Sequence, residues 1–158
     1  MELGEGSAVS SFAGFYEHER DGAIRLAWLL THDSNVAEDV VQDAFTVVFH
    51  RFDTIDYPGA YLRRVVVNGV YARTRRTGRE TRRLHQVARD LPTSVDGPTG
   101  GLVDAIAQLP LNQRTVIVLR YWADLDHHAI AEAMDSRPGT VRSLLSRATA
   151  QLRKDITP

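Results

Sequence analysis

The sequence predicts an all-α protein of two small helical domains, residues 11–85 and 102–158, joined by a flexible linker over residues 86–101. Apolar residues recur at the three- to four-residue spacing of amphipathic helices in most segments of the chain. The segment HQVARDLPTSVDGPTGG interrupts this pattern with two prolines and three glycines, a composition typical of a linker. With 158 residues, 43% of them hydrophobic, the chain can bury one or two small cores.

Composition also argues against several protein classes. No apolar run approaches the roughly 18 to 20 residues that span a bilayer, and the start MELGEGSAVSSF lacks the basic and apolar parts of a signal peptide. We therefore expect a cytoplasmic protein. The chain has no cysteine, so disulfides and thiolate metal sites are excluded.

The first domain is expected to begin with a helix or helix pair over residues 11–30, which ends at the turn formers THDS. The next helix, residues 35–52, has an apolar stripe and an acidic flank. The stripe consists of Val36, Val40, Ala44, Val47 and Val48, and the flank of Glu38, Asp39, Gln42 and Asp43. The segment DTIDYPG then forms a loop, because a Pro-Gly pair strongly favours a turn.

A third helix begins with AYLRRVVVNGVYARTRR, residues 60–76, and its C-terminal half is strongly basic. The segment RTRRTGRETRR, residues 73–83, holds six arginines in eleven positions. Cations near a helix C-terminus gain about 0.3 to 1 kcal/mol each from the helix dipole, but one or two arginines would satisfy it. Dipole matching therefore does not explain the cluster.

The near-neutral net charge of −1 conceals a strong asymmetry along the chain. Residues 1–57 carry a net charge of −8, residues 58–90 carry +7, and residues 91–158 are balanced. A block of like charge forms either a solvated helix face or a surface for a polyanion, and charge alone leaves both interpretations open.

The second domain shows a recognisable order of helices. Two helical runs, GLVDAIAQL and NQRTVIVLRYW, precede a short helix around Ile130, a turn at Asp135 and a longer helix with Pro138 near its first position. The apolar stripe of the longer helix consists of Val141, Leu144, Leu145, Ala148 and Leu152. This order is that of a helix-turn-helix, whose second helix enters a major groove.

The exposed face of that longer helix supplies candidate DNA contacts. They are Arg137, Thr140, Arg142, Ser143, Ser146 and Arg147, and no acidic residue follows Arg137 before Asp155. Arginine and hydroxyl groups can contact guanine edges and phosphate oxygens. A plain helical hairpin with a solvated face is the alternative interpretation.

Four segments in order resemble the bacterial extracytoplasmic-function (ECF) sigma factors of the sigma-70 family. They are AEDVVQDAF, AYLRRVVVNGVYARTRR, LPLNQRTVIVLRYWADLDHHAIAEAM and GTVRSLLSRATAQLR, and the resemblance covers residues 12 to 155. The ratio of eighteen arginines to one lysine is typical of a GC-rich genome such as an actinobacterium's.

The resemblance implies a dissociable subunit that binds core RNA polymerase, through the coiled coil of the β′ subunit, and promoter DNA. The polymerase contacts would be Asp39, Val40, Gln42, Asp43 and Phe45. Burial in the core is an equal alternative for Val40 and Phe45. An anti-sigma partner is possible, and we expect the free protein to be a monomer that needs no cofactor.

The resemblance also assigns promoter contacts. The third helix and its preceding loop would open the −10 element, and the second domain would read the −35 element. The −10 contacts would be Asp56, Tyr57, Tyr61, Arg63, Arg64, Asn68, Arg73, Arg75 and Arg76. Loop residues 53–57 would capture a flipped base, on which Tyr57 and Tyr61 could stack. Buried packing is the alternative for the tyrosines, and capping or kinking beside Gly69 is the alternative for Asn68.

Two positions in the helix-turn-helix depart from the family pattern. Asp135 stands where glycine is common, and it can adopt the left-handed conformation at modest cost. Arg137 stands where a serine cap is usual, so Ser136 could cap the helix instead. The start of the recognition helix is therefore open by one residue.

An enzymatic role is disfavoured. His128 and Glu132 have the i, i+4 spacing of two metal ligands, but no third ligand follows at an informative spacing. No HExxH, GxSxG or phosphate-binding glycine loop is present. The main rival function is a free-standing helix-turn-helix regulator that does not bind polymerase.

Overall fold

A computed structural model describes residues 3–84 and 101–156, and all regular elements in these two ranges are helical. The longer elements of the first range are α1 (Leu3–Thr31), α2 (Ser34–Arg51) and α3 (Pro58–Leu84), with a 3₁₀ turn η1 (Phe52–Thr54). The second range contains α4 (Leu102–Gln108), α5 (Leu111–Ile117), a π-helical turn η2 (Val118–Trp122), α6 (His127–Ala133) and α7 (Pro138–Ile156). The all-α prediction is confirmed. Residues 86–100 of the predicted linker lie outside the described residues, so the domain division stays a prediction.

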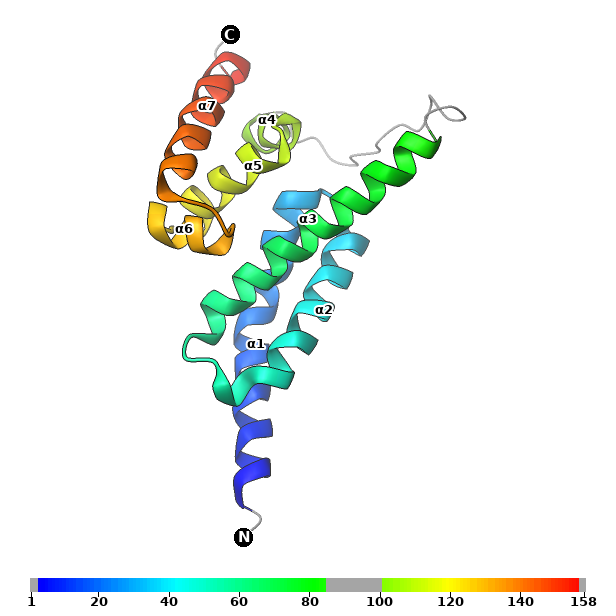
Figure 1. The fold of residues 1–158 in the computed structure, drawn as a ribbon, viewed down its shortest axis with the longest axis vertical. Coiled ribbons are helices and arrows are strands. Elements are labelled where there is room, and N and C mark those ends of the chain that lie inside the picture. Colours follow the sequence, from blue (N-terminus) through cyan, green and yellow to red (C-terminus); the bar gives the residue numbers. More distant parts are fainter. Residues whose placement is uncertain (1–2, 85–100, 157–158) are drawn as a thin grey trace.

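Helices α1, α2 and α3 pack together as one unit (Figure 1). The first helix is continuous from Leu3, so the expectation of a helix or helix pair resolves to one long helix. Helix α2 begins after Asp33, whose carboxylate accepts hydrogen bonds from the backbone N–H groups of Asn35 and Val36 at 3.0 and 3.1 Å. This N-cap satisfies two donors that the helix itself leaves without partners.

The buried face of α2 differs from the predicted stripe, because Val36 is only half-buried and Ala37, which lies outside the stripe, is buried. Val47 is 41% exposed, whereas Val41 and Phe45 are buried. Val47 lies at the edge of the face whose centre is formed by Ala37 and Val48, so neighbouring helices cover it only in part. The prediction that Val47 belongs to the core stripe is therefore wrong.

A glycine allows α2 and α3 to approach closely. A Cβ atom added to Gly69 of α3 would lie 3.1 Å from Cγ1 of the buried Val40 of α2. That distance is shorter than most carbon contacts, so a larger residue would push the helices apart or displace Val40. The close approach brings the next turn of α3, which carries Arg73, over α2.

The second described range forms a helix-turn-helix, as predicted. Helix α6 ends at Ala133, and Asp135 adopts a left-handed φ of 52°. The Ser136 N–H then donates to the Ala131 carbonyl at 2.8 Å, as in a Schellman C-cap. Helix α7 begins at Pro138, which fixes the start of the recognition helix, and its predicted core residues Val141, Leu144, Ala148 and Leu152 are buried while Leu145 is half-buried.

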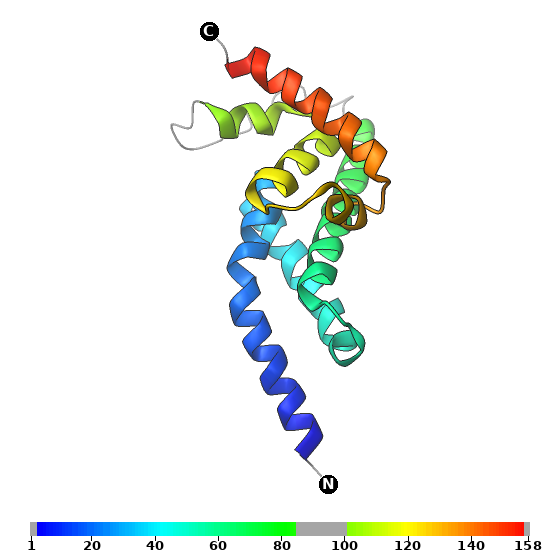
Figure 2. The ribbon, with the colours of Figure 1, turned by 90° about the vertical axis from the view of Figure 1, so that its left-hand side faces the viewer.

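The two described ranges pack against each other in a closed arrangement (Figures 1 and 2). Helix α6 contacts α3, and α1 contacts α4, α5 and η2. The Tyr71 hydroxyl donates to Thr115 at 3.2 Å, and Arg114 donates to the Leu30 carbonyl at the end of α1. Thr115 is completely buried, whereas Tyr71 is half-buried, so the hydrogen bond between them lies at the inner part of this interface.

Candidate functional site

The predicted polymerase-binding residues of α2 divide into exposed and buried ones. Asp39, Gln42 and Asp43 are exposed and are called the docking face below. Val40 and Phe45 are only 2% and 4% exposed, because their side chains fill the core between the helices. The prediction is corrected accordingly: Val40 offers no surface to a partner, and Phe45 contributes only to the wall of a groove.

That groove runs between α1 and α2 beside the docking face, with a volume of about 410 Å³. Its apolar wall is built by Phe12, Tyr16, Phe45 and Phe49. The rings of Tyr16 and Phe45 lie 4.7 Å apart and those of Phe12 and Phe49 lie 5.0 Å apart, in edge-to-face geometry. Sequence reasoning missed this groove. The signal was the i, i+4 spacing of the aromatic residues within each of the two helices.

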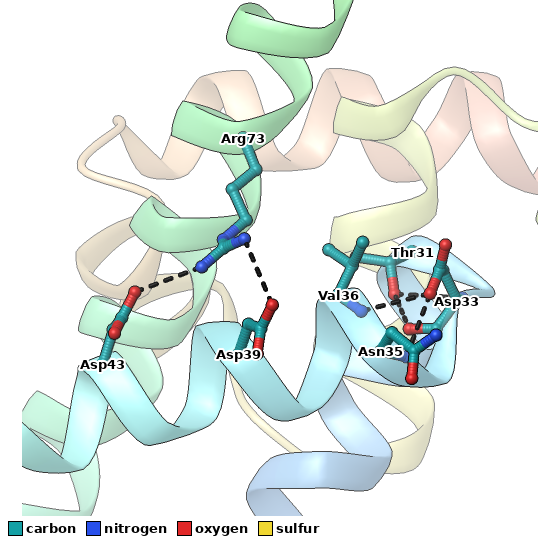
Figure 3. Close-up of polar contacts among 7 residues, drawn as sticks. All are labelled: Thr31, Asp33, Asn35, Val36, Asp39, Asp43 and Arg73. Atoms are coloured by element: carbon teal, nitrogen blue, oxygen red, sulfur yellow. Dashed lines mark hydrogen bonds and ion pairs between the residues drawn. The ribbon is translucent and has the colours of Figure 1, made fainter.

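The docking face is directly joined to the basic helix through an arginine. Nη2 of Arg73 in α3 lies 3.1 Å from the Asp43 carboxylate, and its Nη1 lies 3.8 Å from that of Asp39 (Figure 3). Sequence reasoning placed Arg73 on a DNA surface and both aspartates on a polymerase surface. The structure brings these two predicted surfaces into contact.

The remaining predicted −10 residues of α3 are mostly accessible. Asn68, Arg75 and Arg76 are exposed, and Arg63 and Arg64 are half-buried. Arg64 forms an ion pair with Asp135 of the helix-turn-helix at 3.4 Å. Helix α3 continues without interruption through Asn68, so the Asn68 side chain neither starts nor ends a helix.

The structure separates the roles proposed for Tyr57, in the loop before α3, and Tyr61, in the first turn of α3. Tyr57 is 79% exposed, and Asp56 is also exposed, so both can meet a ligand. Tyr61 packs against the hydrophobic core as a half-buried residue, which favours the packing interpretation for this side chain. Only Tyr57 therefore has the accessibility that stacking on an unpaired base requires.

The recognition helix α7 presents its predicted face to solvent. All six predicted −35 contacts are exposed: Arg137, Thr140, Arg142, Ser143, Ser146 and Arg147. Nε of Arg147 donates a hydrogen bond to the Ser143 carbonyl at 3.3 Å, so its guanidinium lies beside Ser143 on the exposed face of α7. The arrangement can place hydroxyls and guanidinium groups against base edges and phosphates.

Three titratable side chains with shifted pKa values, His32, Tyr71 and Arg114, lie where the two described ranges meet. Burial lowers the pKa of His32, and the positive charge of Arg114 lowers it further, while Asp104 and a backbone hydrogen bond to Leu29 oppose this change. Burial also raises the pKa of the Tyr71 phenol and lowers that of Arg114. His32 Nε2 has no hydrogen-bond partner among the described residues. This interface therefore favours a neutral imidazole.

His128 and Glu132 are both exposed on α6. Across residues 3–84 and 101–156, no group of three or more His, Asp or Glu side chains is arranged to hold a metal ion. Within the same ranges, no helix has the length and apolar character that crossing a membrane requires.

Comparison with known proteins identifies two family segments, one on each side of the predicted linker. The sigma-70 region 2 model matches residues 15–80, and the sigma-70 region 4 model matches residues 100–152. The RNA polymerase sigma-E factor of Streptomyces coelicolor is 33% identical over 94% of this chain and 87% of its own length. The corresponding factor of Streptomyces avermitilis is 34% identical over 94% of this chain and 86% of its own.

Two solved structures share the fold. The sigma factor RpoE of Bartonella quintana, solved with the anti-sigma factor NepR, has a TM-score of 0.75 at 23% identity and covers 91% of this chain and 95% of its own. CnrH, solved with the cytosolic domain of CnrY, has a TM-score of 0.65 at 23% identity and covers 94% of this chain and 92% of its own. From the matched regions and the sequence relatives together, the chain is a member of the ECF group of the sigma-70 family of RNA polymerase sigma factors.

Proposed function

We propose that this sigma factor binds core RNA polymerase through the docking face of α2 and recognises promoters through α3 and α7. The observation that carries the assignment of surfaces is the segregation of charge on adjacent helices. Exposed carboxylates gather on α2, whereas exposed guanidinium groups gather on α3 and on the outer face of α7. Phosphates would repel the first surface and attract the others. Sigma factors are initiation factors rather than enzymes, so these surfaces bind and position.

The groove beside Gln42 supports the choice of α2. Protein interfaces use an apolar centre with a polar rim, and the aromatic wall of the groove next to an exposed amide and two carboxylates has this composition. A free-standing regulator has no need for such a surface beside a basic helix. The polymerase-binding function therefore accounts for a feature that the rival leaves unexplained.

The closed arrangement must open before both promoter elements are bound. The elements are named for positions about 25 base pairs apart, which corresponds to about 85 Å of B-form DNA. Helix α3 has 27 residues and α7 has 19, so even placed end to end they would span only about 70 Å. In the closed arrangement α3 and the helix-turn-helix touch at Arg64 and Asp135. We propose that binding to polymerase separates the two halves.

An anti-sigma partner, of the kind present in the two solved relatives, is a proposal for this chain. Such a partner would be expected to favour the closed arrangement, because that state keeps the two DNA-binding helices together. A ligand shifts a conformational equilibrium only through its difference in affinity between the two states.

The docking assignment is tested by replacing Gln42 with alanine. Gln42 is exposed and is not a buried core residue, so the variant should keep its fold and bind core polymerase less tightly. The exposed Gln108→Ala on α4 is the matched control and should bind normally. Equal affinity of both variants for core polymerase, measured by fluorescence anisotropy, would count against α2 as the docking surface.

A further inference from the structure

Arg73 is held between two carboxylates of the docking face. Asp39 and Asp43 are four residues apart on α2, so both project toward the same guanidinium (Figure 3). The shorter contact, between Nη2 and Asp43 Oδ2 at 3.1 Å, is also a hydrogen bond. Two carboxylates therefore face the one guanidinium, that of Arg73, which the family resemblance assigns to a DNA contact.

The backbone fixes this position. Gly69 lies one helical turn before Arg73 on α3, and a Cβ atom added there would lie only 3.1 Å from Cγ1 of Val40 in α2. Because Val40 lies between Asp39 and Asp43 in the sequence of α2, the same close approach places the Arg73 stem over both carboxylates. The ion pairs follow from helix packing and do not require a chance rotamer.

The three side chains differ in accessibility. The carboxylates of Asp39 and Asp43 are 66% and 78% exposed, so a partner can reach them while they face Arg73. The Arg73 side chain is 33% exposed and has most of its surface covered. Arg75 and Arg76, by contrast, are exposed and form no ion pair with any residue that the structure describes. Arg73 is thus the member of this trio whose charge is already compensated.

We propose that Arg73 is an electrostatic relay between polymerase docking and promoter binding, held by Asp39 and Asp43 in the free protein and released to a DNA phosphate when cationic side chains of core polymerase engage those carboxylates. The relay rests on the proposed docking function of α2. Binding linkage makes it reciprocal: a phosphate that takes Arg73 also frees the two carboxylates for polymerase.

The expected size of the effect follows from the exposure of the pairs. An exposed ion pair changes an equilibrium by about 1.5- to 5-fold, so two pairs can change it by up to about 25-fold. One additional contact between a cation and a phosphate steepens the dependence of log affinity on log salt by about 0.7 for single-stranded DNA. The affinity gain and the change in slope are therefore both measurable.

The first experiment measures binding of the free protein to a 20-nucleotide single-stranded DNA across a salt series. Asp39→Asn with Asp43→Asn should bind more tightly than the wild type, by about 2- to 25-fold at low salt, with the slope steeper by about 0.7. Adding Arg73→Ala should remove both gains. The matched control, Glu17→Gln with Glu38→Gln, changes the net charge equally at exposed positions that form no ion pair with Arg73.

The control separates a local effect from a global one. If the Asp variant and the control bind DNA equally well, or if the gain persists in the Arg73→Ala background, net charge alone explains the result and the relay is overturned. Far-UV circular dichroism and thermal melting should show that every variant remains folded.

The second experiment tests the polymerase arm. Arg73→Ala should bind core polymerase about 2- to 25-fold more tightly than the wild type, because both docking carboxylates lose their internal partner. Weaker or unchanged binding would overturn the relay. A wild-type protein that does not bind core polymerase at all would instead overturn the proposed docking function, so the two failures are distinguishable.

Discussion

Replacing Arg114 with alanine should open the closed arrangement. The Arg114 guanidinium donates to the carbonyls of Ala107 and Leu109, at 3.0 Å each, and to that of Leu30. Ala107 and Leu109 belong to the same half as Arg114, so those bonds persist in an open state. Leu30 lies in the last turn of α1 in the other half, and its carbonyl is at the negative end of that helix.

Of the three hydrogen bonds of Arg114, the one to Leu30 is the one that joins the two halves, so it is the bond that this substitution removes from the closed state alone. A hydrogen bond from a charged donor contributes about 1.5 to 3 kcal/mol, which corresponds to a roughly 10- to 150-fold change in the ratio of open to closed molecules. The Leu30 carbonyl becomes hydrated when the halves separate, so no additional penalty for an unsatisfied acceptor applies to the open state.

Energy transfer between two dyes measures this ratio directly. The chain has no cysteine, so single cysteines introduced at the exposed Ala13 of α1 and Ala150 of α7 would be the only labelling sites. Arg114→Ala should lower the transfer efficiency, whereas Arg25→Ala, an exposed arginine of α1, should leave it unchanged. Unchanged transfer in a folded Arg114→Ala protein would refute the reasoning.

Three further predictions concern pH, helix capping and DNA reading. The pKa of His32 lies below its ordinary value of 6.5 in the closed state, so the open state binds the proton more readily. The closed state should therefore be fully stable above pH 6.5 and should weaken as the pH falls below that value. His32→Gln should remove this pH dependence in the energy-transfer assay. Asp33→Ala removes the cap of α2 and should lower the free energy of unfolding by about 0.5 to 2 kcal/mol in urea titrations, without a change in the m value. Arg142→Ala and Arg147→Ala should each lower transcription from a matched promoter; a base contact would relax −35 specificity by about 1 to 3 kcal/mol, whereas a phosphate contact would weaken all sequences alike.

Local pattern was sufficient to predict most of the helices and the turn between α6 and α7. The spacing of Val141, Leu144 and Ala148 identified the buried face of α7, and the tolerance of aspartate for a left-handed conformation explained Asp135. These features depend on residues within one or two helical turns. Residues close together in the sequence therefore determine these helices and this turn.

The errors concern residues whose environment is set by distant segments. Helical spacing showed that α2 has an apolar face, but it did not show which residues α1 and α3 cover. Val47 was therefore assigned to the core, and docking and burial were left as equal alternatives for Val40. The ion pairs of Arg73 with α2 were missed for the same reason. They join residues about 30 positions apart, and they depend on the helix approach at Gly69.

Initiation by reconstituted polymerase tests the central claim most directly. The purified chain would be mixed with core RNA polymerase and a supercoiled plasmid library of genomic fragments from the source organism, and transcript 5′ ends would be mapped. The account predicts start sites that share sequence about 10 and 35 base pairs upstream, that require the chain, and that are lost when Arg142 and Arg147 are both replaced by alanine. Transcription that starts at the same sites with and without the chain would contradict its role as a promoter-specificity subunit.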